Sequence, residues 1–202
     1  MKIKIFLLII LIVSLVGCRS SKPVAPTFYL IEFPSDKEVD EETSVTLPFS
    51  LEILDVDVHP AFASRQIALR EKEYEVRYYS HHEWAVRPSE SLTRYLYDYF
   101  KRSEIFRYTD TRFWNVLPDY RLNVKVHKLE VIEDENDYLA HVHADFELIM
   151  VEGNVAVVQH GVNKTRLLEK RNLNLFAGAI NDMFFEEVFF FSRKILYEFS
   201  AE

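Results

Sequence analysis

Residues 122–148, LNVKVHKLEVIEDENDYLAHVHADFEL, decide the fold because apolar and polar side chains alternate along both halves of this stretch. In the first half, Leu122, Val124 and Val126 share one face, and polar side chains occupy the other. The second half alternates in the same way over 142–148, and an acidic segment separates the two halves. A period of two is typical of a strand with one buried face, so the stretch predicts two paired antiparallel strands.

The parity of this alternation changes once within the first strand. The apolar positions move to Leu129 and Val131, which indicates one extra residue and predicts a β-bulge near Lys128. A Gly-Asn pair at 153–154 predicts a turn after the second strand, and the alternation resumes over 155–162. The three segments together predict an antiparallel meander.

Two segments have the 3.6-residue period of an amphipathic helix. Behind a Pro-Ser-Glu start signal, residues 88–102 repeat apolar and aromatic side chains at helical spacing, and residues 172–199 do so over a longer stretch. Shorter runs predict further strands at Phe28–Phe33, Leu51–Val58, Gln66–Leu69 and Tyr74–Tyr79. We therefore expect an α+β fold, a two-layer sandwich in which a mostly antiparallel sheet has two main helices packed on one face.

The amino terminus has the parts of a bacterial export signal. Lys2 and Lys4 precede an uncharged apolar run, and this run ends at Leu-Val-Gly-Cys, which resembles the lipobox of bacterial lipoproteins. The run is marginal for crossing a hydrocarbon layer of about 30 Å. Cys18 is the only cysteine of the chain, which fits lipid attachment better than disulfide formation. We expect residues 1–17 to be a signal peptide and Cys18 to carry a diacylglycerol and an N-acyl chain.

The rest of the chain is expected to form one tethered domain. Residues 18–27 are rich in Ser, Lys, Pro and Ala and predict a lipidated tether, and 28–202 predict a single α+β domain. Arg19 stands where enterobacterial lipoproteins of the inner membrane often have Asp, which favours the outer membrane, facing the periplasm, over the inner membrane. The net charge of −8 argues against nucleic-acid binding.

The strand at 141–147 carries the strongest candidate for metal chemistry. His141 and His143 stand two residues apart on one face, a spacing at which two imidazoles can share a zinc ion. The alternative, which we favour, is that this polar face, with Asp145 and Glu147, simply faces solvent. The chain has no Gly-x-Ser-x-Gly motif, and its one cysteine is assigned to the anchor. We therefore expect no enzymatic activity and no cofactor.

A phenylalanine-rich segment at 184–191 offers a candidate partner contact. Successive helical residues turn by about 100°, so its five phenylalanines cannot share one narrow stripe. The segment either forms a wide buried face or leaves some phenylalanines for a partner or a lipid. Phe185, Phe189 and Phe190 are the candidates for that contact.

Several motifs in order along the chain resemble the ABC-type transport auxiliary lipoprotein family. A Tyr-Leu pair at 29–30 matches the early strand of the family, and a later Val-x-Val strand ends at a proline. An Arg-x-Ile-x-x-Arg-like segment then runs from Arg65 to Arg70, and a Trp-Ala pair at Trp84 leads into the first helix. With the lipobox, these motifs make the resemblance moderately specific.

The resemblance implies an accessory protein without catalytic residues. Family members work with ABC-type lipid transporters that contain a mammalian-cell-entry component, so the implied partner is the periplasmic part of such a system, docked to the outer membrane; a homo-oligomer is left open. Arg65, Gln66, Arg70 and Trp84 are expected to fix the junction of turn, strand and helix, with Trp84 as a buried lid. Two alternatives are a lipoprotein that itself binds a lipid or another apolar ligand and a metal-dependent enzyme that uses the two strand histidines.

Overall fold

The computed structural model describes residues 24–34, 46–134 and 137–200. The expected signal peptide and Cys18 lie outside the described residues. Neither of the two described helices is both long and apolar enough to cross a membrane.

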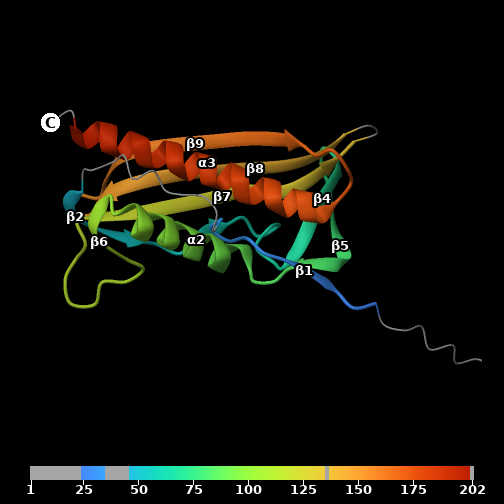
Figure 1. Ribbon diagram of the computed structural model, residues 1–202, viewed down its shortest axis with the longest axis horizontal. Helices are drawn as coiled ribbons and strands as arrows, with labels where there is room; N and C mark the ends of the chain where they lie inside the picture. The colour runs from blue at the N-terminus through green and yellow to red at the C-terminus, as the bar shows by residue number, and fades with distance from the viewer. Residues whose placement is uncertain (1–23, 35–45, 135–136, 201–202) are drawn as a thin grey trace, which may run out of the picture.

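The described residues form a curved sheet with two helices (Figure 1). In chain order the elements are β1 (Thr27–Tyr29), β2 (Leu47–Ile53), β3 (Asp57–Val58), β4 (Gln66–Lys72), β5 (Glu75–Trp84), α2 (Pro88–Ser103), β6 (Phe106–Asp110), β7 (Tyr120–Glu133), β8 (Tyr138–Met150), β9 (Val155–Leu167) and α3 (Leu173–Ser200). The predicted meander corresponds to β7, β8 and β9, and both predicted helices are present. The sequence analysis predicted no strand at the position of β6.

The α+β class is confirmed, and the sheet is mixed. Strands β7, β8 and β9 pair antiparallel, as do β4 and β5. The short strands β2, β3 and β4 instead pair parallel to β7, one after another along its other edge. The register of β7 against β8 shifts between Val126 and Lys128, which confirms the predicted bulge.

Helix α2 begins at the predicted start signal and ends one residue beyond the predicted end at 102. Pro88 occupies the first turn, where its missing N–H leaves no bond unmade. The helix ends at Ser103, because Glu104 takes a left-handed φ of 50° and turns the chain towards β6.

A single strand was expected over 51–58, but the structure divides it into β2 and β3. At the break, the backbone N–H of Val56 turns away from the sheet and donates to Thr93 Oγ1 of α2 at 2.9 Å. The Thr93 hydroxyl in turn donates to the carbonyl of Ser89 at 2.8 Å. These two hydrogen bonds therefore connect α2 to the sheet at the break.

Replacing Thr93 by Val is expected to lower the free energy of unfolding by about 1–3 kcal/mol, because the buried Val56 N–H would lose its acceptor while the side-chain volume stays similar. Urea unfolding followed by circular dichroism measures the change. Thr93→Ser is the matched control, since it keeps the hydroxyl. Equal losses in both variants would contradict this explanation.

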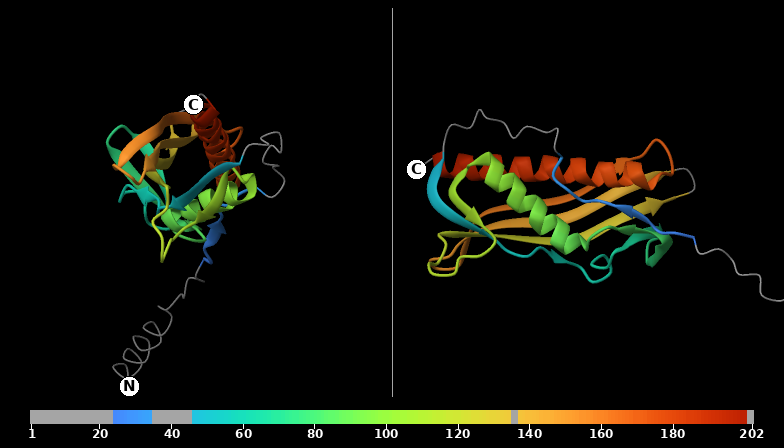
Figure 2. Two further views of the ribbon diagram at one scale, coloured as in Figure 1. Left: turned by 90° about the vertical axis from the view of Figure 1, so that its left-hand side faces the viewer. Right: turned by 60° about the horizontal axis from the view of Figure 1, so that its bottom comes forward.

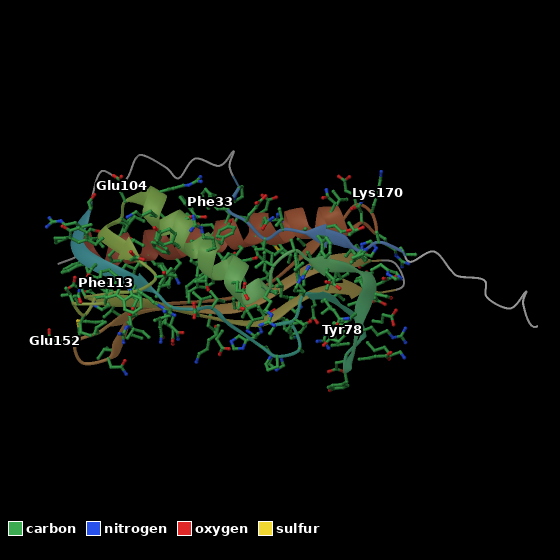
Figure 3. The ribbon with its side chains drawn as sticks, turned by 90° about the horizontal axis from the view of Figure 1, so that it is seen from below. Phe33, Tyr78, Glu104, Phe113, Glu152 and Lys170 are labelled. Carbon is green, nitrogen blue, oxygen red and sulfur yellow. The ribbon has the colours of Figure 1, made fainter. Side chains whose placement is uncertain are left out.

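Both helices pack on the same face of the sheet and against each other (Figure 2). The rings of Tyr95 in α2 and Phe184 in α3 lie 5.3 Å apart, edge to face. Phe33, from the segment after β1, contacts both helices through Tyr95 and Phe185 (Figure 3). The amino-terminal segment is thus fixed to the helical layer by aromatic contacts.

The two ends of the elongated domain differ. The described amino terminus leaves at the end that carries the β4–β5 hairpin (Figure 1). The β6–β7 loop, with Phe113, and the β8–β9 turn, with Glu152, lie at the opposite end (Figure 3). We call this opposite end, formed by the loop 111–119 and the turn 151–154, the distal end.

Candidate functional site

Arg65 and Trp84 connect the start of β4, the end of β5 and strand β1. The backbone N–H of Trp84 donates to the Arg65 carbonyl at 2.7 Å, and Arg65 Nε donates back to the Trp84 carbonyl at 2.9 Å. The Arg65 guanidinium also lies 5.1 Å from the ring of Phe28 in β1. Trp84 itself is only 2% exposed and packs against Phe176 of α3, whereas Gln66 lies exposed at the start of β4. These contacts connect β1, β4, β5 and α3 at one place.

Arg70 belongs to a second, buried polar cluster. Its Nε donates to Glu130 Oε1 at 2.9 Å, and the Glu130 side chain is fully buried in β7. The ring of His141 in β8 bonds to the same Oε1 at 3.1 Å through Nδ1 and to Asn163 Oδ1 at 2.8 Å through Nε2. Burial raises the pKa of Glu130, but the bonds from His141 and Arg70 outweigh it, so the pKa lies below its ordinary value.

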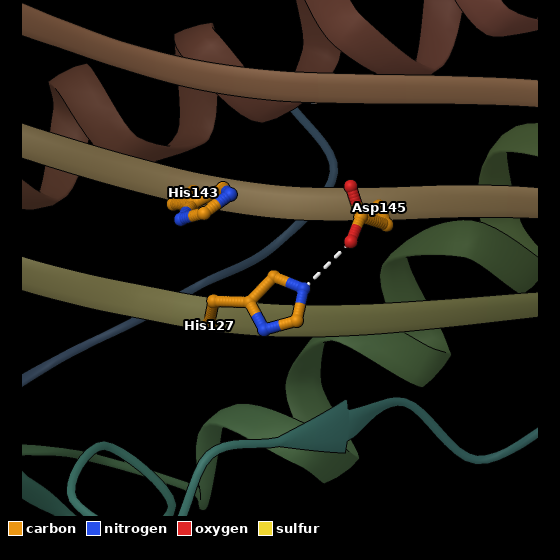
Figure 4. Close-up of side chains that lie close together, drawn as sticks. All are labelled: His127, His143 and Asp145. Carbon is orange, nitrogen blue, oxygen red and sulfur yellow. Dashed lines mark hydrogen bonds and ion pairs between the residues drawn. The ribbon is translucent and has the colours of Figure 1, made fainter.

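The prediction that His141 faces solvent is wrong, because Glu130 and Asn163 cover it from both neighbouring strands. His143 does not share a site with His141. Instead it approaches His127 of β7, with ring centroids 4.8 Å apart, and Asp145 stands beside them (Figure 4). We call His127, His143 and Asp145 the histidine cluster. Sequence reasoning missed His127, although the parity shift at the bulge next to it was a usable signal.

The candidate phenylalanines of α3 have three different environments. Phe185 packs against Phe33 and Tyr99, and the ring of Phe189 stacks on that of Phe185. Phe190 is 54% exposed. Of the three, Phe190 offers the most surface to a partner, and the use of any of them as a contact stays a prediction.

Phe190 lies in a surface groove of about 570 Å³ between α3 and β9. We call it the α3–β9 groove; its lining residues are Val157, Val158, Gln159, His160, Phe190, Arg193, Lys194, Tyr197 and Glu198. Arg193 and Lys194 bring positive charge to a chain whose net charge is negative. Strand β9 pairs only with β8 among the described strands, so its other edge borders the groove. Tyr197 is strongly exposed here, and the sequence analysis did not single it out.

The distal end exposes further apolar side chains. Trp114, Val116 and Leu117 of the β6–β7 loop are each more than two-thirds exposed. The sequence analysis did not single them out, although a Trp, a Val and a Leu in one short loop are a recognisable signal for a contact surface. Exposed apolar side chains therefore lie both in the α3–β9 groove and in the loop at the distal end.

These features define an α+β domain with exposed apolar side chains in the α3–β9 groove and at the distal end. The sequence model of the ABC-type transport auxiliary lipoprotein component matches residues 29–178. The chain therefore belongs to this family and is an auxiliary component of an ABC-type transport system. No curated protein sequence matches the chain significantly.

Solved structures support the same fold. A DUF330 family protein from Xanthomonas campestris is similar with a TM-score of 0.63 at 16% identity, over 82% of this chain and 90% of that one. A second structure, of an uncharacterized protein, has a TM-score of 0.66 at 11% identity, over 85% of this chain and 99% of that one. At these identities the likeness concerns the fold alone.

Proposed function

We propose that this chain is a non-enzymatic, lipid-anchored adaptor that docks the periplasmic mammalian-cell-entry component of an ABC-type lipid transporter to the outer membrane. Family membership supports the coarse part of this proposal. The α3–β9 groove is the observation that carries the docking step, because an exposed aromatic side chain in a concave, mostly apolar surface is typical of a protein contact.

The chemistry of the groove indicates what kind of segment it accepts. Phe190 and Tyr197 supply apolar area, and Arg193 and Lys194 contribute two cations against the one carboxylate of Glu198. A complementary segment carries apolar side chains that fill the groove and acidic residues that meet the two cations. We assign that segment to the periplasmic component of the transporter.

The position of the distal end relative to the described amino terminus suits an adaptor. The tether leaves from the opposite end, and α3, with 28 residues, runs for about 42 Å along the domain. A partner on the groove and the loop at Trp114 would therefore stand away from the membrane that holds the anchor. Docking and anchoring occupy separate parts of the chain.

Phe190→Glu is expected to reduce co-purification of the transporter component at least about tenfold, because a carboxylate would be placed in the apolar contact next to the acidic partner segment. Pull-down of the full-length protein from cells after crosslinking, with quantitative mass spectrometry, measures the change. Since Phe190 is 54% exposed, the midpoint temperature of thermal unfolding should change little.

Tyr74→Glu is the matched control, because Tyr74 is an aromatic residue at the β4–β5 turn and is 91% exposed. It should leave co-purification unchanged. Equal co-purification of the Phe190 and Tyr74 variants would show that the groove is not the docking site. If no transport component is recovered with the unmodified protein, the adaptor function itself is wrong.

A second candidate function is direct binding of a lipid or another apolar ligand. The groove volume of about 570 Å³ lies in the range of small-molecule sites, which favours this candidate. Native mass spectrometry of the purified protein distinguishes the two functions, because a ligand carrier retains a lipid in addition to its covalent chains. Loss of that mass in Phe190→Glu would place the ligand in the groove.

A further inference from the structure

Three potential metal ligands converge on the sheet face opposite the helices. In the histidine cluster, one ligand atom of each residue lies within 4.8 Å of those of the other two. His127 Nε2 and Asp145 Oδ2 are 2.7 Å apart and share a hydrogen bond. The three side chains point towards one another from the neighbouring strands β7 and β8 (Figure 4).

The bulge in β7 creates this convergence. Val126 pairs with Ala144, and Lys128 pairs with His143, so His127 is the extra residue between two regular pairs. Two residues of β7 thus stand opposite one residue of β8, which brings His127 beside His143 rather than one full step away. On β8, Asp145 follows at the next position of the same face.

The third strand leaves space beside the carboxylate. Gly161 of β9 pairs with Asp145, and a Cβ at Gly161 would lie 3.1 Å from Asp145 Oδ1, closer than ordinary contacts. Because Gly161 has no side chain, the Asp145 carboxylate can keep its position next to the imidazoles without a steric clash. A depression of about 300 Å³, lined by Lys125, Asp145 and Gly161, lies beside the carboxylate; His127 and His143 do not line it.

We propose that the histidine cluster binds one divalent transition-metal ion of the Zn²⁺ type, with His127, His143 and Asp145 as its three protein ligands. Two imidazoles and one carboxylate are a ligand set that Zn²⁺ and its neighbours in the first transition series accept, and solvent completes the coordination. Small rotations of the side chains bring atoms that lie within 4.8 Å to the edges of a tetrahedron around one ion.

The electrostatic surroundings fit an ion of moderate affinity. An imidazole must be neutral to coordinate a metal ion, and the ordinary pKa of histidine allows this at neutral pH. Among the described residues, neither ring nitrogen of His143 has a hydrogen-bond partner. Asp145 supplies negative charge, while Lys125 and Lys128 on β7 flank the cluster and oppose a cation.

Isothermal titration of the full-length protein in detergent with Zn²⁺ alone tests this proposal. The protein must be purified without a polyhistidine tag. We expect one saturable site per chain for Zn²⁺ and none for Mg²⁺, which prefers oxygen ligands. His143→Ala should weaken Zn²⁺ binding at least about tenfold. Loss of a group that only supports a ligand already lowers metal affinity about tenfold or more, and loss of the ligand itself should lower the affinity at least as much. Asp145→Asn should also weaken it.

His81→Ala is the matched control, since His81 is an exposed strand histidine outside the cluster, and it should bind Zn²⁺ unchanged. In nitrogen-detected NMR spectra, Zn²⁺ should shift the imidazole signals of His127 and His143 only. Thermal unfolding without metal checks that each variant folds. Unaltered binding in both His143→Ala and Asp145→Asn, equal losses in His81→Ala, or no saturable binding by the unmodified protein would overturn the proposal.

Discussion

Arg70→Met is expected to lower the free energy of unfolding by about 3–5 kcal/mol, because it leaves the fully buried carboxylate of Glu130 without its cation. The side chain of Arg70 is 18% exposed, so solvent screens the pair only weakly. Met fills much of the space of the arginine stem, which limits the contribution of lost packing. Urea unfolding of the purified protein measures the loss.

The pH dependence of this loss identifies its cause. In the folded protein the pKa of Glu130 lies below its ordinary value of 4.5, so the stability that Glu130 contributes is present above that pH. It is lost as the pH falls through 4.5 towards the lower pKa of the folded state. Without Arg70, the effect of burial, which raises the pKa of Glu130, is offset only by His141, so the pKa of Glu130 rises. The stability difference between the two proteins should therefore shrink at about pH 4.

Two further variants separate charge from packing. Arg94→Met removes an arginine whose side chain is 71% exposed and pairs with Asp98, so it should cost at most about 0.5 kcal/mol. Adding Glu130→Gln to Arg70→Met should restore part of the stability, since the buried group is then neutral and its amide oxygen still accepts from His141. An Arg70 variant as stable as the Arg94 variant would contradict a structural function of the buried pair.

The parts of the fold that sequence predicts are those whose signals are local. The meander, its bulge and both helices depend on periods of two or 3.6 residues within one segment, and all are present in the structure. The parallel pairing of β2, β3 and β4 along one edge of β7 has no such local signal. These pairs join residues far apart in sequence, and the division of β2 from β3 depends on Thr93 in a later helix.

The same distinction holds for the candidate sites. Alternation places His141 and His143 on one face correctly, but the neighbouring strands give them different environments. Glu130 and Asn163 enclose the first histidine, whereas the second meets His127 across the bulge. Cross-strand register decides both outcomes, and a single sequence specifies register only through its turns and its buried face.

Anchoring and docking can be separated experimentally through Cys18, which we propose as the lipidated residue. Cys18→Ser is expected to abolish incorporation of labelled palmitate and to move the protein from the membrane fraction to the soluble periplasmic fraction. Three acyl chains hold a protein firmly, because each buried methylene contributes about 0.8 kcal/mol, and no other membrane attachment is proposed. To avoid retention by an uncleaved signal, residues 1–17 are exchanged for an ordinary secretory signal.

The released protein should still bind its transporter component, because the α3–β9 groove is formed by residues between 157 and 198, far from Cys18 in the sequence. Its thermal unfolding should match that of the lipidated protein. Arg19→Asp is the matched control: lipidation persists, and the protein should shift towards the inner membrane where the enterobacterial sorting rule applies. A Cys18 variant that remains membrane-bound and labelled would disprove the anchor. One that is released and no longer binds the transporter component would show that docking requires the membrane, and that the groove does not act alone.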